Sequence, residues 1–153
     1  WSLIIGGLVF FVLDRWAPQP NQDDAMALPL RTSLVIGLFQ CLALVPGVSR
    51  SGATILGSML MRVEKRAAAE FSFFLAIPIM LGAFVLDAWS NRDNISTDQV
   101  GLIALGFVVS FVVGFIVVRT LLDFVSKRGF APFAWWRILV GVGGLVFLTM
   151  TGR

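Results

Sequence analysis

The feature that most constrains the fold is a long apolar stretch, residues 34–61, that a short polar segment interrupts near its middle. The arm Leu34–Val45 is apolar, residues 46–52 read Pro-Gly-Val-Ser-Arg-Ser-Gly, and the arm Ala53–Met61 is apolar again. At 1.5 Å per residue, each arm spans about half of a hydrocarbon core of about 30 Å. The stretch is therefore either one long broken crossing of a membrane or a re-entrant hairpin with its turn at mid-depth.

The other apolar runs indicate a membrane protein. Residues 1–13 are too short to cross a bilayer and are interpreted as the end of a truncated helix. Three runs have the length of spanning helices: 67–86, 100–118 and 133–150. Residues 91–99 are predicted to be a loop, and residues 119–131 a helix end followed by a basic loop. Because 58% of the residues are hydrophobic and only 14% charged, with a mean hydropathy of +0.89, residues 1–153 are predicted to form a single all-α, polytopic membrane domain.

Basic residues favour the hairpin over the crossing. A hairpin places eight Lys and Arg residues on one side of the membrane and two on the other, whereas a crossing divides them four to six. Because cytoplasmic loops carry an excess of Lys and Arg, we expect a re-entrant hairpin with its mouth in the cytoplasm and the C-terminus outside. The eight residues on the cytoplasmic side are Arg15, Arg31, Arg62, Lys65, Arg66, Arg119, Lys127 and Arg128, and the other two are Arg92 and Arg153.

The polar interruption holds the residues best suited to chemistry. Arg50 would lie at mid-membrane, at a cost of about 2.5–3.5 kcal/mol unless it is paired. The glycines and hydroxyl residues around it are Gly47, Ser49, Ser51, Gly52 and Thr54. The second arm begins directly after the turn, so its helix N-terminus would direct free N–H groups into the same space. Together these groups predict a phosphate site. The alternative is a Pro-Gly break whose arginine snorkels or pairs with an acid.

Charged residues elsewhere have mainly structural interpretations. Glu70 is interpreted either as a helix-start acid near the positive end of the helix dipole or as a partner of Arg50 and the turn hydroxyls. Arg137, near the start of the last span, is expected to snorkel or to contact lipid head groups. Asp123 is expected to pair with Lys127 at helical spacing. The chain has no His and a single Cys, so an intrachain disulfide is excluded.

Three segments resemble a known family. Residues 40–55, QCLALVPGVSRSGATI, resemble the second signature of the undecaprenyl-diphosphate phosphatases, the bacitracin-resistance family. Residues 67–78, AAAEFSFFLAIP, are similar to the segment that follows it there, and residues 130–137, FAPFAWWR, to the start of the last helix. The match runs in order over nearly the whole chain.

The resemblance implies a fold, a reaction and a location. Members of this family hydrolyse the terminal phosphate of undecaprenyl diphosphate in the bacterial inner membrane. The product lipid carrier is reused for peptidoglycan synthesis, and the activity gives resistance to bacitracin. The implied fold is two inverted repeats, each a re-entrant hairpin plus three spanning helices, with the site where the hairpin tips meet. The chain corresponds to the second repeat preceded by a partial helix, the C-terminal part of a longer protein.

By position in the signature, Arg50 is the residue expected to bind the diphosphate and act in catalysis. We assign the other diphosphate-binding positions to Ser49, Ser51, Gly52 and Thr54, with Gln40, Gly47 and Glu70 as supporting residues. The family's acidic pair, nucleophile candidate and His belong to its first signature, with a divalent cation such as magnesium. None of that signature is in this sequence. No metal ligand is therefore predicted in this chain, and the chain alone is predicted to be inactive.

A second hypothesis is a flippase or transporter that binds a phosphorylated lipid head group without cleaving it, because re-entrant hairpins in inverted repeats also occur in transporters. The expected partners are a polyprenyl diphosphate, membrane lipids and the missing N-terminal repeat. Nucleic acid is not expected, and a homodimer is left open.

Overall fold

The computed structural model describes residues 1–92 and 100–151, which form six α-helices and one short 3₁₀ turn. The elements are α1 (Ser2–Trp16), α2 (Leu30–Gln40), η1 (Cys41–Leu44), α3 (Arg50–Leu60), α4 (Lys65–Ser90), α5 (Val100–Arg128) and α6 (Ala131–Met150). Helices α4, α5 and α6 are long and apolar enough to cross a membrane. The prediction of an all-α chain with three helices of spanning length is therefore confirmed for the described residues. The loop predicted for residues 91–99 lies mostly outside them.

Helix α5 is longer than the sequence pattern indicated. The basic loop predicted within residues 119–131 is wrong, because the helix continues through Arg128 and turns only at Gly129. Residues 119–128 contain neither Gly nor Pro, so nothing local stops the helix. Gly129 has a φ of 67°, a left-handed conformation that glycine adopts without strain. Pro132 then lies in the first turn of α6, where a missing N–H costs nothing.

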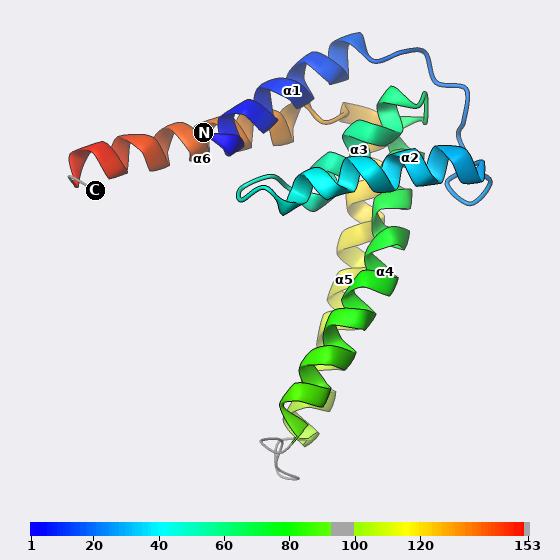
Figure 1. Cartoon of the computed structure of the whole chain (residues 1–153), viewed down its shortest axis with the longest axis vertical. Helices are drawn as coiled ribbons and strands as arrows, with labels where there is room; N and C mark the ends of the chain where they lie inside the picture. Colours follow the sequence, from blue (N-terminus) through cyan, green and yellow to red (C-terminus); the bar gives the residue numbers. More distant parts are fainter. Residues whose placement is uncertain (93–99, 152–153) are drawn as a thin grey trace.

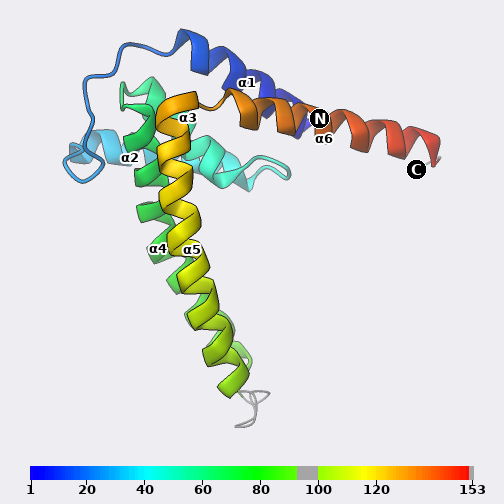
Figure 2. The same ribbon diagram turned by 180° about the vertical axis from the view of Figure 1, so that it is seen from behind.

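The helices form two arms and a hairpin (Figures 1 and 2). Helices α4 and α5 lie side by side in one arm, and α1 and α6 lie side by side in the other. Helices α2 and α3 pack against each other where the arms meet. Close approach in the α1–α6 arm depends on glycine: a Cβ on Gly141 would lie 2.6 Å from Ile4 Cγ1, and one on Gly7 would lie 2.7 Å from Ile138 Cγ1.

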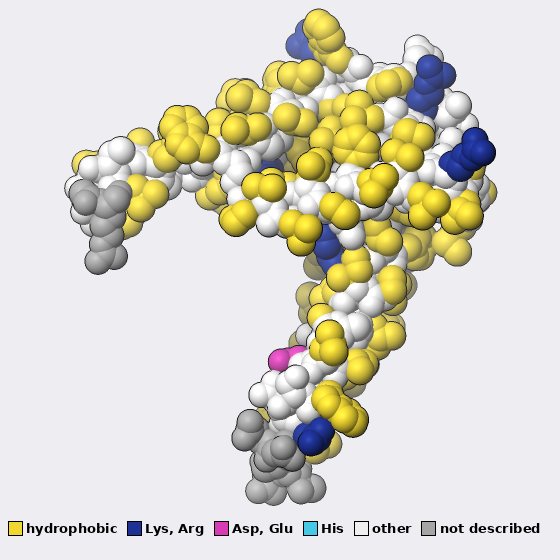
Figure 3. Space-filling model, in the orientation of Figure 1, with side chains coloured by type: hydrophobic (Ala, Val, Ile, Leu, Met, Phe, Trp, Pro, Cys, Tyr) yellow, Lys and Arg dark blue, Asp and Glu magenta, His cyan; other side chains and the backbone are white. Residues whose placement is uncertain are grey.

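The two arms run in clearly different directions in both views (Figures 1 and 2). Membrane helices tilt by about 0–40° from the bilayer normal, so a single normal does not run along both arms as they lie here. The arms are joined mainly through α3, which contacts α4 in one arm and α1 in the other. Much of their apolar surface is exposed (Figure 3), and no buried residue lies in the most apolar window of α5. Such surface is typical of helices that face lipid.

The buried core lies at the junction. Ala67, Ala68 and Ala69 are almost completely buried at the start of α4, and their small side chains allow α4 to approach α3 closely. The larger buried apolar residues of the same cluster are Leu13, Ile36, Ile55, Met59, Val63, Val125 and Phe130. The cluster therefore fixes the hairpin against the base of both arms.

A partly buried carboxylate ties three elements together at this junction. Asp14 Oδ1, near the end of α1, lies 2.5 Å from Lys65 Nζ at the start of α4. The same oxygen accepts a hydrogen bond of 3.2 Å from the backbone N–H of Phe130, which precedes α6. The Asp14 side chain is only 15% exposed. Removing it would leave the Phe130 N–H without its partner and the Lys65 ammonium with only the Asp14 backbone carbonyl, at 3.3 Å.

We expect Asp14→Ala to lower the stability of the protein by about 1–3 kcal/mol, the cost of leaving partly buried donors unsatisfied. For a chain of this size each kcal/mol corresponds to about 2–4 °C in Tm, which thermal unfolding in detergent measures. Asp23→Ala is the matched control, because Asp23 is exposed and makes no hydrogen bond or ion pair within the described part of the chain. If the two variants had the same Tm, the contacts of the Asp14 side chain would not stabilise the junction.

Candidate functional site

The site is built on the turn between α2 and α3. After η1 the chain turns at Pro46 and Gly47, and Gly47 has a φ of 84°. The Ser2 hydroxyl at the start of α1 donates to the Pro46 carbonyl at 3.1 Å. A Cβ on Gly47 would lie 2.0 Å from Ser2 Oγ. Both the backbone conformation and the space therefore require glycine, and α1 holds the turn in place.

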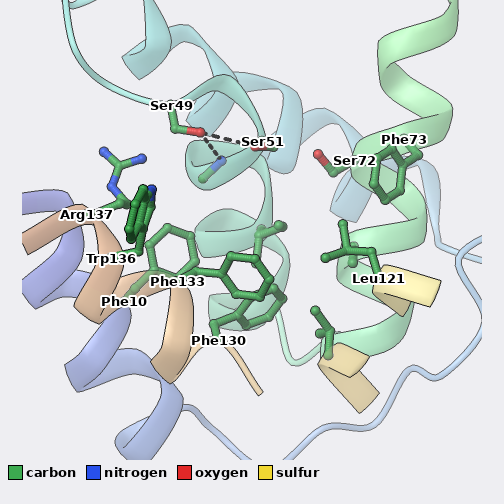
Figure 4. A pocket seen from close by; sticks show the side chains of 14 residues that line it. Phe10, Ser49, Ser51, Ser72, Phe73, Leu121, Phe130, Phe133, Trp136 and Arg137 are labelled. Atoms are coloured by element: carbon green, nitrogen blue, oxygen red, sulfur yellow. Dashed lines mark hydrogen bonds between the residues drawn. The ribbon is translucent and has the colours of Figure 1, made fainter. Parts of the chain in front are cut away.

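Ser49 and Ser51 organise the first turn of α3. Ser49 is the N-cap residue, and its hydroxyl accepts the Gly52 N–H at 3.1 Å. The hydroxyls of Ser49 and Ser51 lie 3.1 Å apart (Figure 4). Capping satisfies one of the free N–H groups of the helix, and the positive end of the α3 dipole remains directed toward the turn. This end of the helix favours an anion.

Arg50 is the first residue of α3 and is half-buried. Within residues 1–92 and 100–151, its guanidinium forms neither a hydrogen bond nor an ion pair, although its carbonyl accepts from Thr54. The alternative of a structural arginine paired with an acid is therefore absent from the described chain. A guanidinium offers up to five N–H donors in a planar fork, and here no described residue accepts from them.

Thr54 and Gln40 connect the two arms of the hairpin. Thr54 is 1% exposed. Its hydroxyl lies 3.3 Å from Gln40 Oε1 on α2 and 3.0 Å from the Arg50 carbonyl one turn earlier on α3. The prediction that Thr54 binds the diphosphate stays a prediction. In this structure the hydroxyl braces α2 against α3, and Gln40 is its partner.

We expect Thr54→Val to reduce stability by about 1 kcal/mol, because the substitution keeps the shape but removes the hydrogen bonds. Thr54→Ser should retain them and recover most of the loss. Thr120→Val is the control, since the Thr120 hydroxyl donates only within its own helix, to Ile116. Thermal unfolding of the three variants gives the comparison, and an unchanged Tm for Thr54→Val would argue against a brace.

Two acidic residues lie away from the turn. Glu70 Oε1 accepts from Arg66 Nε at 3.0 Å, and it forms no hydrogen bond with Arg50 or with a turn hydroxyl. Asp123 was expected to pair with Lys127, but its carboxylate lies 3.3 Å from Arg66 Nη1 instead. Arg66 therefore bridges α4 and α5 through two carboxylates, a pairing between helices that spacing along one helix does not reveal.

Arg137 is the residue that sequence reasoning missed. It was expected to snorkel or to contact lipid head groups, but its Nη2 lies 3.4 Å from the Gly47 carbonyl and donates to it. Its Nε is buried without a hydrogen-bond partner among the described residues. Gly6 on α1 makes room for it, because a Cβ there would lie 2.7 Å from Arg137 Nη2. The sequence did contain a sign of this role: Arg137 is a charged residue one turn inside an apolar helix, and charged residues within membrane helices generally mark functional positions.

Two cavities meet at the turn. The first, of about 360 Å³, is lined by residues from both arms and by Ser49, Ser51 and Arg137 (Figure 4). The second, of about 330 Å³, lies between α1 and the hairpin. Ser49, Gly52 and Arg137 line both of them. The polar groups of the turn therefore lie between two largely apolar spaces.

The residues of the turn do not fit a divalent cation. Arg50 and Arg137 are both cationic, and the described part of the chain contains no cluster of three or more His, Cys, Asp or Glu residues that could hold a metal. The arrangement is suited to an anion. A magnesium ion held by residues outside this chain stays a prediction.

Comparison with known proteins agrees with these features. The model of the bacitracin resistance protein BacA family matches residues 1–143. The chain belongs to this family. The BacA relatives include undecaprenyl-diphosphatase of Caulobacter sp. (strain K31), 62% identical over 144 residues, which are 94% of this chain and 54% of the relative. Undecaprenyl-diphosphatase 1 of Agrobacterium fabrum is 61% identical over 150 residues, 98% of this chain and 56% of the relative.

A third BacA relative, undecaprenyl-diphosphatase of Sinorhizobium fredii, is 59% identical over 150 residues. The resemblance read from residues 40–55, 67–78 and 130–137 is thereby confirmed. The chain spans about half the length of the curated relatives it matches.

Proposed function

We propose that the protein containing this chain is an undecaprenyl-diphosphate phosphatase and that the chain supplies the anion-binding half of its active site. The observation that carries the proposal is the polar turn: Arg50 begins the capped helix α3 and its guanidinium has no hydrogen-bond or ion-pair partner among the described residues, and Arg137 donates to the Gly47 carbonyl of the same turn. Family membership and the names of relatives about 60% identical support the reaction.

The roles follow from the chemistry of phosphoryl transfer. Positioning and stabilisation of charge on the phosphoryl oxygens account for most of the catalysis in such reactions. Arg50 can form a bidentate contact with a phosphate, and the α3 N-terminus adds backbone donors. Ser49 is occupied as the cap of α3. We therefore assign to this half the binding of the diphosphate, and to residues outside it the acids, the His, the nucleophile and the divalent cation.

The geometry of the hairpin supports a re-entrant insertion. The 20 residues of α6 give it a length of about 30 Å. The hairpin mouth is level with the start of α6, because Asp14 contacts both Lys65 and the N–H of Phe130. The turn contacts Arg137, six positions after Ala131, a rise of about 9 Å. The hairpin thus reaches only part of the length of α6 before it returns.

We extend the proposal to the whole arrangement: a bacterial inner-membrane protein of two inverted repeats, with the hairpin mouth cytoplasmic and the C-terminus outside. The charge distribution of the sequence supports this orientation. In such a protein the outer faces of both arms would pack against the other repeat or face lipid.

Phosphate release from undecaprenyl diphosphate tests the function. The complete natural protein, purified in detergent and supplied with magnesium, should release inorganic phosphate, whereas residues 1–153 alone should not. If the isolated chain released phosphate at enzyme-like rates, the proposal that it supplies only half of the active site would be overturned. Movement of the lipid between leaflets without any phosphate release by the complete protein would overturn the phosphatase.

A further inference from the structure

Two successive carbonyl groups of the turn accept hydrogen bonds from the same arm of the molecule. The Pro46 carbonyl accepts from the Ser2 hydroxyl of α1 at 3.1 Å. The Gly47 carbonyl accepts from Arg137 Nη2 of α6 at 3.4 Å. Because α1 and α6 lie side by side, the α1–α6 arm engages the carbonyl groups of the turn from one side.

The N–H groups that follow these carbonyls have no partner. Within the described part of the chain, the backbone N–H groups of Ser49, Arg50 and Ser51 form no hydrogen bond. They lie at the positive end of α3, where unpaired N–H groups favour an anion. A carbonyl oxygen repels an anion, so a phosphate site at this place requires the carbonyls of the turn to be engaged elsewhere. The contacts with the arm meet that requirement.

We propose that Arg137 is a positioning residue for phosphoryl transfer: its hydrogen bond to the Gly47 carbonyl holds the turn so that the N–H groups of residues 49–51 face the phosphate. This inference rests on the proposed function and adds to it a residue that acts through the turn. Arg50 binds the diphosphate in that proposal, whereas Arg137 fixes the backbone that presents Arg50.

The surroundings of Arg137 support this role. Among the described residues that line either cavity, Arg137 is the only charged one, and a charge inside an apolar membrane helix is costly. Its side chain extends from α6 toward the turn beside Ser49 (Figure 4). A Cβ on Gly6 of α1 would lie 2.7 Å from Arg137 Nη2 and 3.2 Å from Cζ. Both helices of the arm therefore leave room for this contact.

We expect the effect on the chemical step rather than on binding. N–H groups aimed at a phosphoryl oxygen stabilise charge that develops in the transition state, and a misplacement of about 1 Å can cost about 10²-fold in rate. In the complete protein, Arg137→Met should therefore lower kcat for undecaprenyl diphosphate by about 10²-fold and change KM by less than about threefold. Arg137→Lys keeps a charged donor of similar reach and should recover kcat to within about tenfold of the unmodified protein.

A second variant moves the guanidinium without removing it. The Cβ of Gly6→Ala would displace the end of the flexible Arg137 side chain from the Gly47 carbonyl, so we expect kcat to fall by about tenfold with an unchanged Tm. Gly37→Ala is the matched glycine control, because no atom lies within 4 Å of its Cβ position. Arg119→Met, which removes an exposed arginine of α5, is the matched charge control. Both controls should retain kcat.

Hydrogen exchange of the complete protein without substrate tests the positioning directly. The Val48 N–H donates to the Val45 carbonyl at 3.0 Å, and the Gly52 N–H donates to Ser49 Oγ at 3.1 Å. In peptides covering residues 42–53, we expect exchange to be about fivefold faster or more in the Met and Ala variants than in the unmodified protein. Peptides from α4 and α5 should not change. Unchanged exchange at the turn in both variants would overturn the proposal.

The kinetic outcomes separate positioning from the other roles of an arginine. If Arg137→Met raised KM at an unchanged kcat, Arg137 would contact the diphosphate itself and the proposal would be overturned. A lower Tm with faster exchange in every peptide, without recovery in Arg137→Lys, would show a purely structural role and overturn it too. If Arg137→Met does not fold, Gly6→Ala provides the same readouts.

The same experiments separate this inference from the proposed function. If the unmodified complete protein released no phosphate, the phosphatase would be removed, and the exchange of residues 42–53 would still decide whether Arg137 holds the turn. If it released phosphate but the Arg137→Met and Gly6→Ala variants kept both kcat and exchange unchanged, the phosphatase would stand and the positioning role would be removed.

Discussion

Replacing Arg50 by alanine should reduce phosphate release from undecaprenyl diphosphate by about 10²–10³-fold in the complete protein, the cost of removing one preorganised donor to a developing oxyanion. The guanidinium lies at the N-terminus of α3 and makes no hydrogen bond or ion pair with the described chain. Its removal should therefore leave the fold intact, and the Tm should change by less than that of Asp14→Ala. Phosphate release and thermal unfolding, measured on the same preparation, separate the two effects.

The conservative variant and a control complete this test. Arg50→Lys keeps the charge but loses the planar fork, so we expect intermediate activity. Arg31→Ala removes an exposed arginine from the first turn of α2 and should retain full activity. If Arg50→Ala released phosphate at the rate of Arg31→Ala, Arg50 would have no role in binding or catalysis.

The features predicted from the sequence are those that depend on neighbouring residues. The Pro46–Gly47 break and the helices of spanning length follow from local patterns, because apolar runs, Pro and Gly act within a few positions. The Ser49 cap and the left-handed conformation of Gly47 were not predicted, although each also depends on neighbouring residues. For these features a single sequence carries nearly all of the information.

The features that were missed join residues far apart in the sequence. Arg137 meets the turn 90 positions earlier, and Lys65 meets Asp14 across 51 positions. Asp123 was assigned to a neighbour on its own helix but pairs with Arg66 on another. Spacing along one helix contains no information on which helix lies beside it. The direction of the two arms is unpredictable from the sequence for the same reason.

The second large effect is expected at Gly47. Gly47→Ala would place a Cβ 2.0 Å from Ser2 Oγ at a φ of 84°. The left-handed conformation costs a non-glycine residue about 1–3 kcal/mol, and displacement of Ser2 removes its hydrogen bond to Pro46, about 1 kcal/mol more. The turn would move away from Arg137. We therefore expect a Tm lower by several degrees and phosphate release lower by about tenfold or more.

Gly37→Ala is the matched control. Gly37 lies within α2, and no atom lies within 4 Å of the position that its Cβ would take. Alanine in a helix interior is more stable than glycine by about 0.5–1 kcal/mol, so the control should keep its activity and melt at the same or a higher temperature. A loss of activity in Gly37→Ala similar to that in Gly47→Ala would mean that the hairpin tolerates no change anywhere, and the argument from the turn would fail.

A second-site change separates the two causes of the effect at Gly47. Ser2→Ala removes the oxygen that a Cβ at position 47 would strike, but it leaves the backbone conformation as it is. In the Gly47→Ala, Ser2→Ala double variant we expect partial recovery of the Tm, because the steric term is relieved and the φ strain remains. Full recovery would show that the left-handed backbone costs little here. No recovery would show that the backbone alone requires glycine and that the contact with α1 only follows the turn.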